Sequence, residues 1–132
     1  MEEILYLFVY GTLKRTHKGH NSERLRNESD LVSDSATVYG SLYDLGSFPG
    51  LKLDNDCKDI AWGHLVKLHD EKSFDWLDNY EGVDRTNSNR GLYRRELVMC
   101  ILPETMEAVW AYTYVYNGNV SNLKQLNAWE RD

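Results

Sequence analysis

Residues 4–13 read ILYLFVYGTL, and the first seven positions of this run are all apolar or aromatic. A short apolar run rich in β-forming residues predicts a strand that is buried on both faces. The strand is expected to stop at Gly11, because Gly-Thr-Leu-Lys follows without further strand pattern. The sequence therefore predicts a buried strand near its start, and the other elements are predicted from the segments that follow.

Strands outnumber helices in the rest of the sequence. Further strands are predicted at residues 36–43, 51–53, 60–68, 92–102 and 107–116. The last of these has apolar side chains on both faces, which is typical of a central, covered strand. One clear helix is predicted from Glu71 to about Glu81 with Asp70 as its N-cap, a short helix within the polar residues 17–30, and a loop at residues 82–91. About six strands with peripheral helices indicate an α+β domain with a curved or barrel-like sheet.

Size and charge exclude several classes of partner. With 132 residues, we expect residues 1–132 to form one domain. The net charge is −6, which disfavours nucleic acid because phosphate neutralisation supplies most of that affinity. No apolar run approaches the roughly 20 residues that span a bilayer, and Glu2 and Glu3 stand where a signal peptide carries positive charge. We expect a cytoplasmic protein with no membrane partner, free thiols at Cys57 and Cys100, and a monomer as the default state.

A carboxylate ends the apolar stripe of the predicted helix. Phe74, Leu77 and Glu81 share one face, whereas Lys72, Asp75, Asp78 and Asn79 point elsewhere. An inward carboxyl group loses hydration, which raises its pKa and suits it to acid/base work near neutral pH. The alternative is that Glu81 lies at a frayed helix end and pairs with Arg94 or Arg95.

The end of the first strand is a second candidate site. After Tyr10, the N–H groups of Gly11, Thr12 and Leu13 have no predicted ladder partner, and glycine lets a ligand approach the backbone. Such amides bind a carboxylate or stabilise an oxyanion. An ordinary strand-to-loop turn is the structural alternative.

Other chemistry finds little support in the sequence. His17 and His20 lack further ligands at zinc spacing, so no metal is predicted. There is no nucleophile elbow and no glycine-rich phosphate loop. Tyr43 and Tyr114 are candidates for ligand contact, although tyrosines in such strands are commonly core residues.

Several segments, taken in order, resemble the gamma-glutamylcyclotransferase-like family, which includes avirulence-induced-gene-like proteins and gamma-glutamylamine cyclotransferase. The matching segments are FVYGTLK at 8–14, GSLYDLGSFPG at 40–50, GHLV at 63–66, LDNYEG at 77–82, YRR at 93–95 and WAYTYVY at 110–116. The long polar loop at residues 83–91 and the tail after Asn117 depart from the common pattern.

The resemblance implies a small mixed β-barrel with flanking helices and one pocket. It also implies that Tyr10, Gly11, Thr12 and Leu13 hold the gamma-glutamyl end of a substrate, and that Glu81 is the acid/base. The implied reaction is ring closure by the substrate's own α-amine, which gives 5-oxoproline and a free amine without a metal or organic cofactor. A non-catalytic module that binds a small acidic metabolite or a protein, and a hydrolase that uses water, remain as alternatives.

Overall fold

The fold is described by a computed structural model for residues 3–11, 19–54, 56 and 58–129. Within these residues it contains the following strands and helices in chain order: β1 (Tyr6–Val9), α1 (His20–Glu28), β2 (Ser29–Asp44), β3 (Pro49–Leu53), β4 (Ile60–Leu68), α2 (Ser73–Tyr80), β5 (Tyr93–Leu102), β6 (Glu107–Tyr116) and β7 (Gln125–Leu126).

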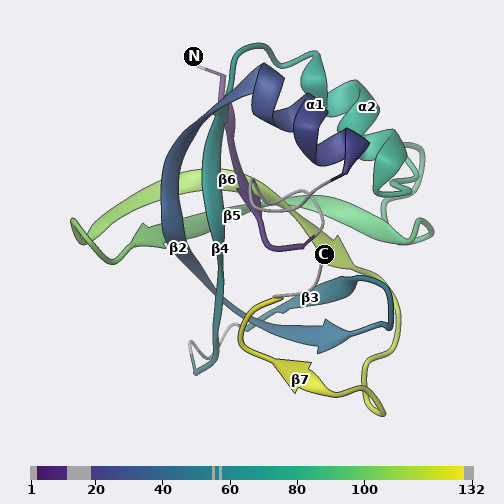
Figure 1. Ribbon diagram of the computed structural model, residues 1–132. Coiled ribbons are helices and arrows are strands. Elements are labelled where there is room, and N and C mark those ends of the chain that lie inside the picture. Colours follow the sequence, from purple (N-terminus) through teal and green to yellow (C-terminus); the bar gives the residue numbers. More distant parts are fainter. Residues whose placement is uncertain (1–2, 12–18, 55, 57, 130–132) are drawn as a thin grey trace.

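Five of the strands close into a mixed barrel in the order β2-β4-β1-β6-β5. The barrel closes where Thr37 of β2 pairs with Ile101 of β5. β1 runs parallel to β6, and the other neighbours in the barrel are antiparallel. Figure 1 shows β3 and β7 at the far end of β2, away from the two helices. The α+β class and the predicted barrel are therefore confirmed.

β1 is buried on both faces, as its sequence predicts. Phe8 and Tyr10 belong to the cluster that also holds Leu42, Leu65 and Ala111. Leu7 and Val9 belong to a second cluster, which includes residues of both helices. Side chains alternate between the two faces of a strand, and the side chains on both faces of β1 are buried in these clusters. β1 therefore lies between the two hydrophobic clusters, one inside the barrel and one under the helices.

The two helices lie side by side against the barrel (Figure 1). The Glu28 carboxylate at the end of α1 accepts hydrogen bonds from Ser73 at 2.5 Å and from the Trp76 indole at 2.9 Å, both in α2. Leu25, Phe74 and Leu77 fill the space between helices and sheet. No helix among the described residues is both long and apolar enough to cross a membrane.

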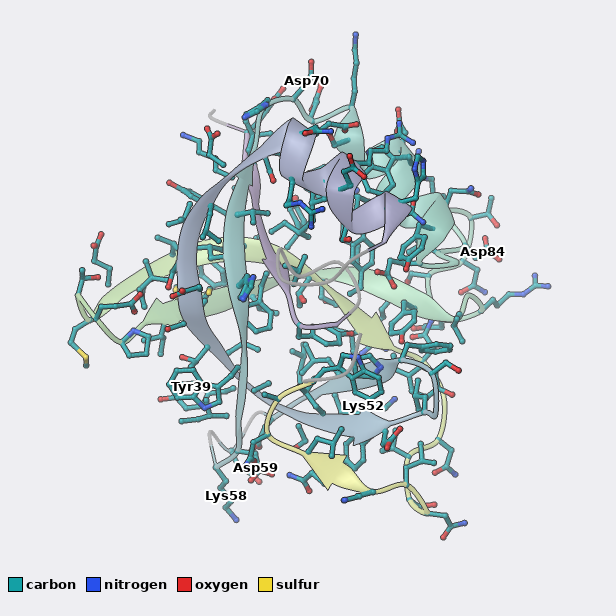
Figure 2. All side chains as sticks on the ribbon, in the orientation of Figure 1. Tyr39, Lys52, Lys58, Asp59, Asp70 and Asp84 are labelled. Atoms are coloured by element: carbon teal, nitrogen blue, oxygen red, sulfur yellow. The ribbon has the colours of Figure 1, made fainter. Side chains whose placement is uncertain are left out.

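Several element boundaries differ from the predictions, including the starts of β2 and α2. β2 begins at Ser29, seven residues before the predicted start, because a polar stretch with two register shifts still pairs with β4. Helix α2 begins at Ser73 with Lys72 as its N-cap. Asp70 lies in the turn before it (Figure 2), where its carboxylate accepts the Lys72 N–H at 2.9 Å. The short strand β7 was not predicted, since two residues carry no readable period.

Candidate functional site

A pocket of about 280 Å³ lies where β1 ends and α2 ends. It is lined by Phe8, Val9, Tyr10, Gly11, Ser47, Phe48, Pro49, Tyr80, Glu81, Leu92, Tyr93 and Tyr114. The pocket therefore brings together four of the residues singled out in the sequence: Tyr10, Gly11, Glu81 and Tyr114. The predicted contacts of Thr12 and Leu13 lie outside the described residues. Tyr43 pairs with Gly50 and Gln125 in the outer strands and is not among the residues that line the pocket.

Glu81 is held in place by the way α2 ends. It is the C-cap of the helix, and its N–H donates to the Leu77 carbonyl at 2.9 Å. Gly82 follows with φ of 69°, a left-handed conformation that favours glycine. The N–H of Val83 then donates back to the Asp78 carbonyl at 2.9 Å. This closing turn fixes the backbone of Glu81, so its side chain is aimed by the helix end and not by a mobile loop.

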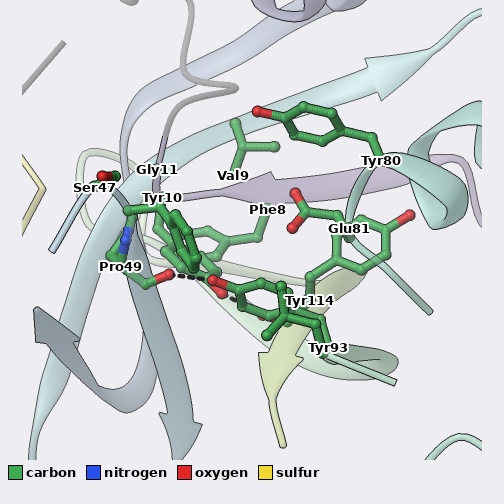
Figure 3. A pocket seen from close by; sticks show the side chains of 12 residues that line it. Phe8, Val9, Tyr10, Gly11, Ser47, Pro49, Tyr80, Glu81, Tyr93 and Tyr114 are labelled. Carbon is green, nitrogen blue, oxygen red and sulfur yellow. Dashed lines mark hydrogen bonds between the residues drawn. The ribbon is translucent and has the colours of Figure 1, made fainter. Parts of the chain in front are cut away.

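The Glu81 carboxyl group points into the pocket (Figure 3). It makes no hydrogen bond or ion pair with any residue of the described part of the chain. Arg94 pairs instead with Glu96 at 2.9 Å, and Arg95 lies 3.5 Å from the carboxylate of Asp78. Burial, and to a smaller extent the negative charge of Asp78, together raise the pKa of Glu81 to about 8. At neutral pH the group is mainly protonated, yet close enough to its pKa to give or take a proton.

Three tyrosine hydroxyls are fixed around the pocket. Tyr10 donates to the carbonyl of Tyr114, and Tyr93 donates to the carbonyl of Pro49 at 2.6 Å. Tyr114 donates to the Asp78 carboxylate at 2.7 Å. Burial raises the pKa of all three hydroxyls well above the ordinary value, so they stay neutral at physiological pH. Three tyrosines of the pocket wall are therefore held by hydrogen bonds and uncharged, and Glu81 beside them has a pKa of about 8.

Gly11 lies across the pocket from Glu81 (Figure 3). A Cβ atom at this position would stand 2.9 Å from Cγ of Pro49, closer than such atoms approach one another. Glycine is required here because the end of β1 passes directly against the start of β3. Gly11 itself therefore lines the pocket, on the side opposite the Glu81 carboxyl group.

Asp78 is the polar residue of this region that the sequence reasoning placed wrongly. It is only 3% exposed, whereas the sequence analysis placed it off the buried face of the helix, together with Lys72, Asp75 and Asn79. Its position could have been read from the spacing, since Phe74, Leu77, Asp78 and Glu81 follow the i, i+3, i+4, i+7 pattern of a buried helix face. Phe48, Tyr80 and Tyr93 were also not identified as pocket residues from the sequence.

The sequence of the chain matches a known family along almost all of its length. The family described as gamma-glutamyl cyclotransferase, AIG2-like, matches residues 7–131. A relative from Niallia circulans, gamma-L-glutamyl-butirosin B gamma-glutamyl cyclotransferase, is 37% identical over 112 residues. That alignment covers 84% of this chain and 66% of the relative, so the chain spans just under two thirds of the relative's length.

Two solved structures share the fold. An AIG2-like protein from Mus musculus superposes with a TM-score of 0.76 at 19% identity, over 98% of this chain and 90% of the mouse protein. YkqA from Bacillus subtilis superposes with a TM-score of 0.70 at 22% identity, over 96% of this chain and 40% of YkqA. The barrel, the pocket at the end of β1 and the match over residues 7–131 lead to one conclusion: the chain belongs to the gamma-glutamyl cyclotransferase, AIG2-like family.

Proposed function

We propose that this protein is a cyclotransferase that converts a small gamma-glutamyl amine or gamma-glutamyl peptide to 5-oxoproline and releases the free amine. The observation that carries the proposal is the Glu81 carboxyl group, which faces the end of β1 across one pocket and has a pKa of about 8. Family membership and the printed activity of the Niallia circulans relative support the same reaction class.

The substrate supplies its own nucleophile in this reaction. The α-amine nitrogen attacks the γ-carbonyl carbon, a five-membered ring closes, and the bond from that carbon to the leaving nitrogen breaks. The α-ammonium group loses two protons, which balance the two that the leaving nitrogen gains when it departs as an ammonium ion. Folding the substrate into the attacking shape is worth about 7–11 kcal/mol in well-oriented intramolecular reactions.

Glu81 moves the protons in this mechanism. As a carboxylate it takes a proton from the α-ammonium group, and as an acid it gives one to the leaving nitrogen. One group serves both steps best when its pKa lies near the working pH, which is where burial places Glu81. No step calls for a metal or an organic cofactor.

The residues at the end of β1 bind the gamma-glutamyl end of the substrate. Gly11 and the adjoining Thr12 and Leu13 offer backbone N–H groups to the carboxylate or to the developing oxyanion. Tyr10 and Tyr114 wall the pocket beside them. Tyr43 has no part in this assignment, because it lies outside the pocket lining.

A panel of gamma-glutamyl compounds tests the reaction. It includes gamma-glutamyl-lysine, gamma-glutamyl dipeptides, glutathione and gamma-L-glutamyl-butirosin B, each assayed for 5-oxoproline. We expect release of 5-oxoproline and amine in equal amounts from at least one of them. Melting shifts without turnover across the panel would point to a binding module, and free glutamate in place of 5-oxoproline would point to a hydrolase.

The dependence of kcat/KM on pH follows from the same carboxyl group. Because the productive encounter needs the Glu81 carboxylate and a protonated α-ammonium group, kcat/KM should rise with pH along an acid limb centred near pH 8. Initial rates from pH 5 to pH 9 with one active substrate measure the limb. An acid limb near 4.5, the ordinary value for glutamate, would contradict the assignment.

A further inference from the structure

Asp78 occupies the wall between two cavities. Its carboxylate accepts the Tyr114 hydroxyl hydrogen bond at 2.7 Å, and Tyr114 lines the pocket that holds Glu81. On the other side, Asp78 lines a separate polar cavity of about 500 Å³ together with Arg85 and Arg95. Asp78 therefore lies about one helical turn before Glu81 on α2, and it contacts residues that line both cavities.

The Asp78 carboxylate is held from the outer side by cations. Arg85 donates to Oδ2 from Nε at 3.1 Å and from Nη2 at 2.9 Å, and Arg95 Nε lies 3.5 Å from Oδ1. The Asp78 side chain is 4% exposed, whereas that of Arg85 is 54% exposed. Charge-assisted hydrogen bonds of this kind are stronger than neutral ones, so the two arginines hold the Asp78 carboxylate in one place.

We propose that Asp78 is a positioning residue whose fixed negative charge keeps a proton on Glu81, and that Arg85 sets the strength of this effect from outside the pocket. The inference rests on the proposed role of Glu81 as the acid/base. Asp78 itself contacts Tyr114 and the arginines and does not line the substrate pocket.

Apart from Glu81 itself, the described residues that line its pocket include no acidic side chain. Tyr10 from β1, Tyr93 from β5 and Tyr114 from β6 are buried hydroxyls that remain neutral. Tyr80 of α2 also lines the pocket. Among the described residues that line this pocket there is no lysine, arginine or histidine to offset the repulsion. The like charge of Asp78, about one helical turn earlier on α2, favours the protonated form of the Glu81 carboxyl group.

The test is a direct titration of Glu81 in the intact protein, followed by ¹³C NMR of labelled glutamate carboxyl groups. The Glu81 signal is identified by its loss in the Glu81→Gln variant. Asp78→Asn removes the charge but keeps the shape and an oxygen for Tyr114, and should lower the titration midpoint of Glu81 by about one pH unit. Arg85→Gln removes the outer counter-charge and should move the midpoint the other way, by a smaller amount.

Asp75→Asn is the matched control on the same helix. Asp75 also pairs with Arg85, at 3.0 Å, but its side chain is 73% exposed and its charge is screened by water. We expect no shift of the Glu81 midpoint in this variant. A shift in Asp78→Asn no larger than in Asp75→Asn would overturn the inference, and so would a lowered midpoint in Arg85→Gln. Arg85→Gln changes an exposed side chain, so it decides the question even if Asp78→Asn does not fold.

The titration separates this inference from the proposed function. If no gamma-glutamyl compound is turned over but the midpoint moves as described, the electrostatic role of Asp78 stands and the reaction is wrong. If turnover occurs and the acid limb of kcat/KM moves with the NMR midpoint in each variant, both stand. If turnover occurs but the Glu81 midpoint does not move in Asp78→Asn, the proposed role of Asp78 is wrong and the proposed reaction stands.

Discussion

Replacing Glu81 with Gln should lower kcat for 5-oxoproline release by about 10²–10⁴-fold, the usual contribution of a general acid/base. Glutamine has the shape of the protonated carboxyl group but neither takes nor gives a proton. Because the pKa of Glu81 is about 8, the wild-type group is itself mainly uncharged at pH 7, so the exchange changes little in the folded state there. The loss should therefore fall on turnover and not on folding.

Glu71→Gln is the matched control for this experiment. It makes the same chemical change at an exposed position just before α2, outside the pocket. Both variants should keep the wild-type circular dichroism spectrum and a cooperative melt at pH 7, and only Glu81→Gln should lose turnover. Wild-type kcat in folded Glu81→Gln protein would remove the residue from the mechanism.

The same replacement should stabilise the protein at alkaline pH. In the unfolded chain the Glu81 carboxyl has an ordinary pKa of 4.5, and in the folded protein the value is about 8. Between these two pH values the folded state binds more protons than the unfolded state, so the free energy of unfolding falls as pH rises. The loss begins near pH 4.5, is complete above about pH 8, and amounts to about 1.4 kcal/mol for each unit by which the two pKa values differ.

Glutamine does not titrate, so the Glu81→Gln variant escapes this penalty. Urea unfolding at pH 5 and at pH 9 measures the effect as the difference between variant and wild type. We expect a variant that is close to wild type at pH 5 and more stable by several kcal/mol at pH 9. A difference that does not change between the two pH values would show that the carboxyl group is not desolvated in the folded protein.

The central strand and the late strands could be predicted because their patterns are local. The apolar run before Gly11 has no polar face, and the structure buries both of its faces. The predicted strands at residues 60–68 and 107–116 match β4 and β6. The early half of β2 was missed, because Ser33 and its polar neighbours join the sheet through pairing with β4 and not through any apolar period of their own.

Site residues could be predicted from the sequence where the spacing along one helix determines their direction. Contacts with residues from other elements could not be predicted. Glu81 ends an apolar helix stripe, so its inward direction follows from spacing alone. The spacing also places Asp78 on the buried face, but it does not reveal the partners of its carboxylate, because the Tyr114 hydroxyl lies 36 positions along the chain and Arg85 lies in the following loop. Tyr43 looked equally suitable in the sequence, but it lies at the end of β2 that extends beyond the barrel and pairs with β3 and β7.

The central claim is that the substrate's α-amine, and not water, attacks the γ-carbonyl carbon in the pocket of Glu81. Turnover of an active gamma-glutamyl compound in H₂¹⁸O, with the products analysed by mass spectrometry, tests this most directly. Because ring closure takes no oxygen from the solvent, we predict unlabelled 5-oxoproline in an amount equal to the released amine. Glutamate carrying one ¹⁸O atom in its γ-carboxylate would contradict the claim.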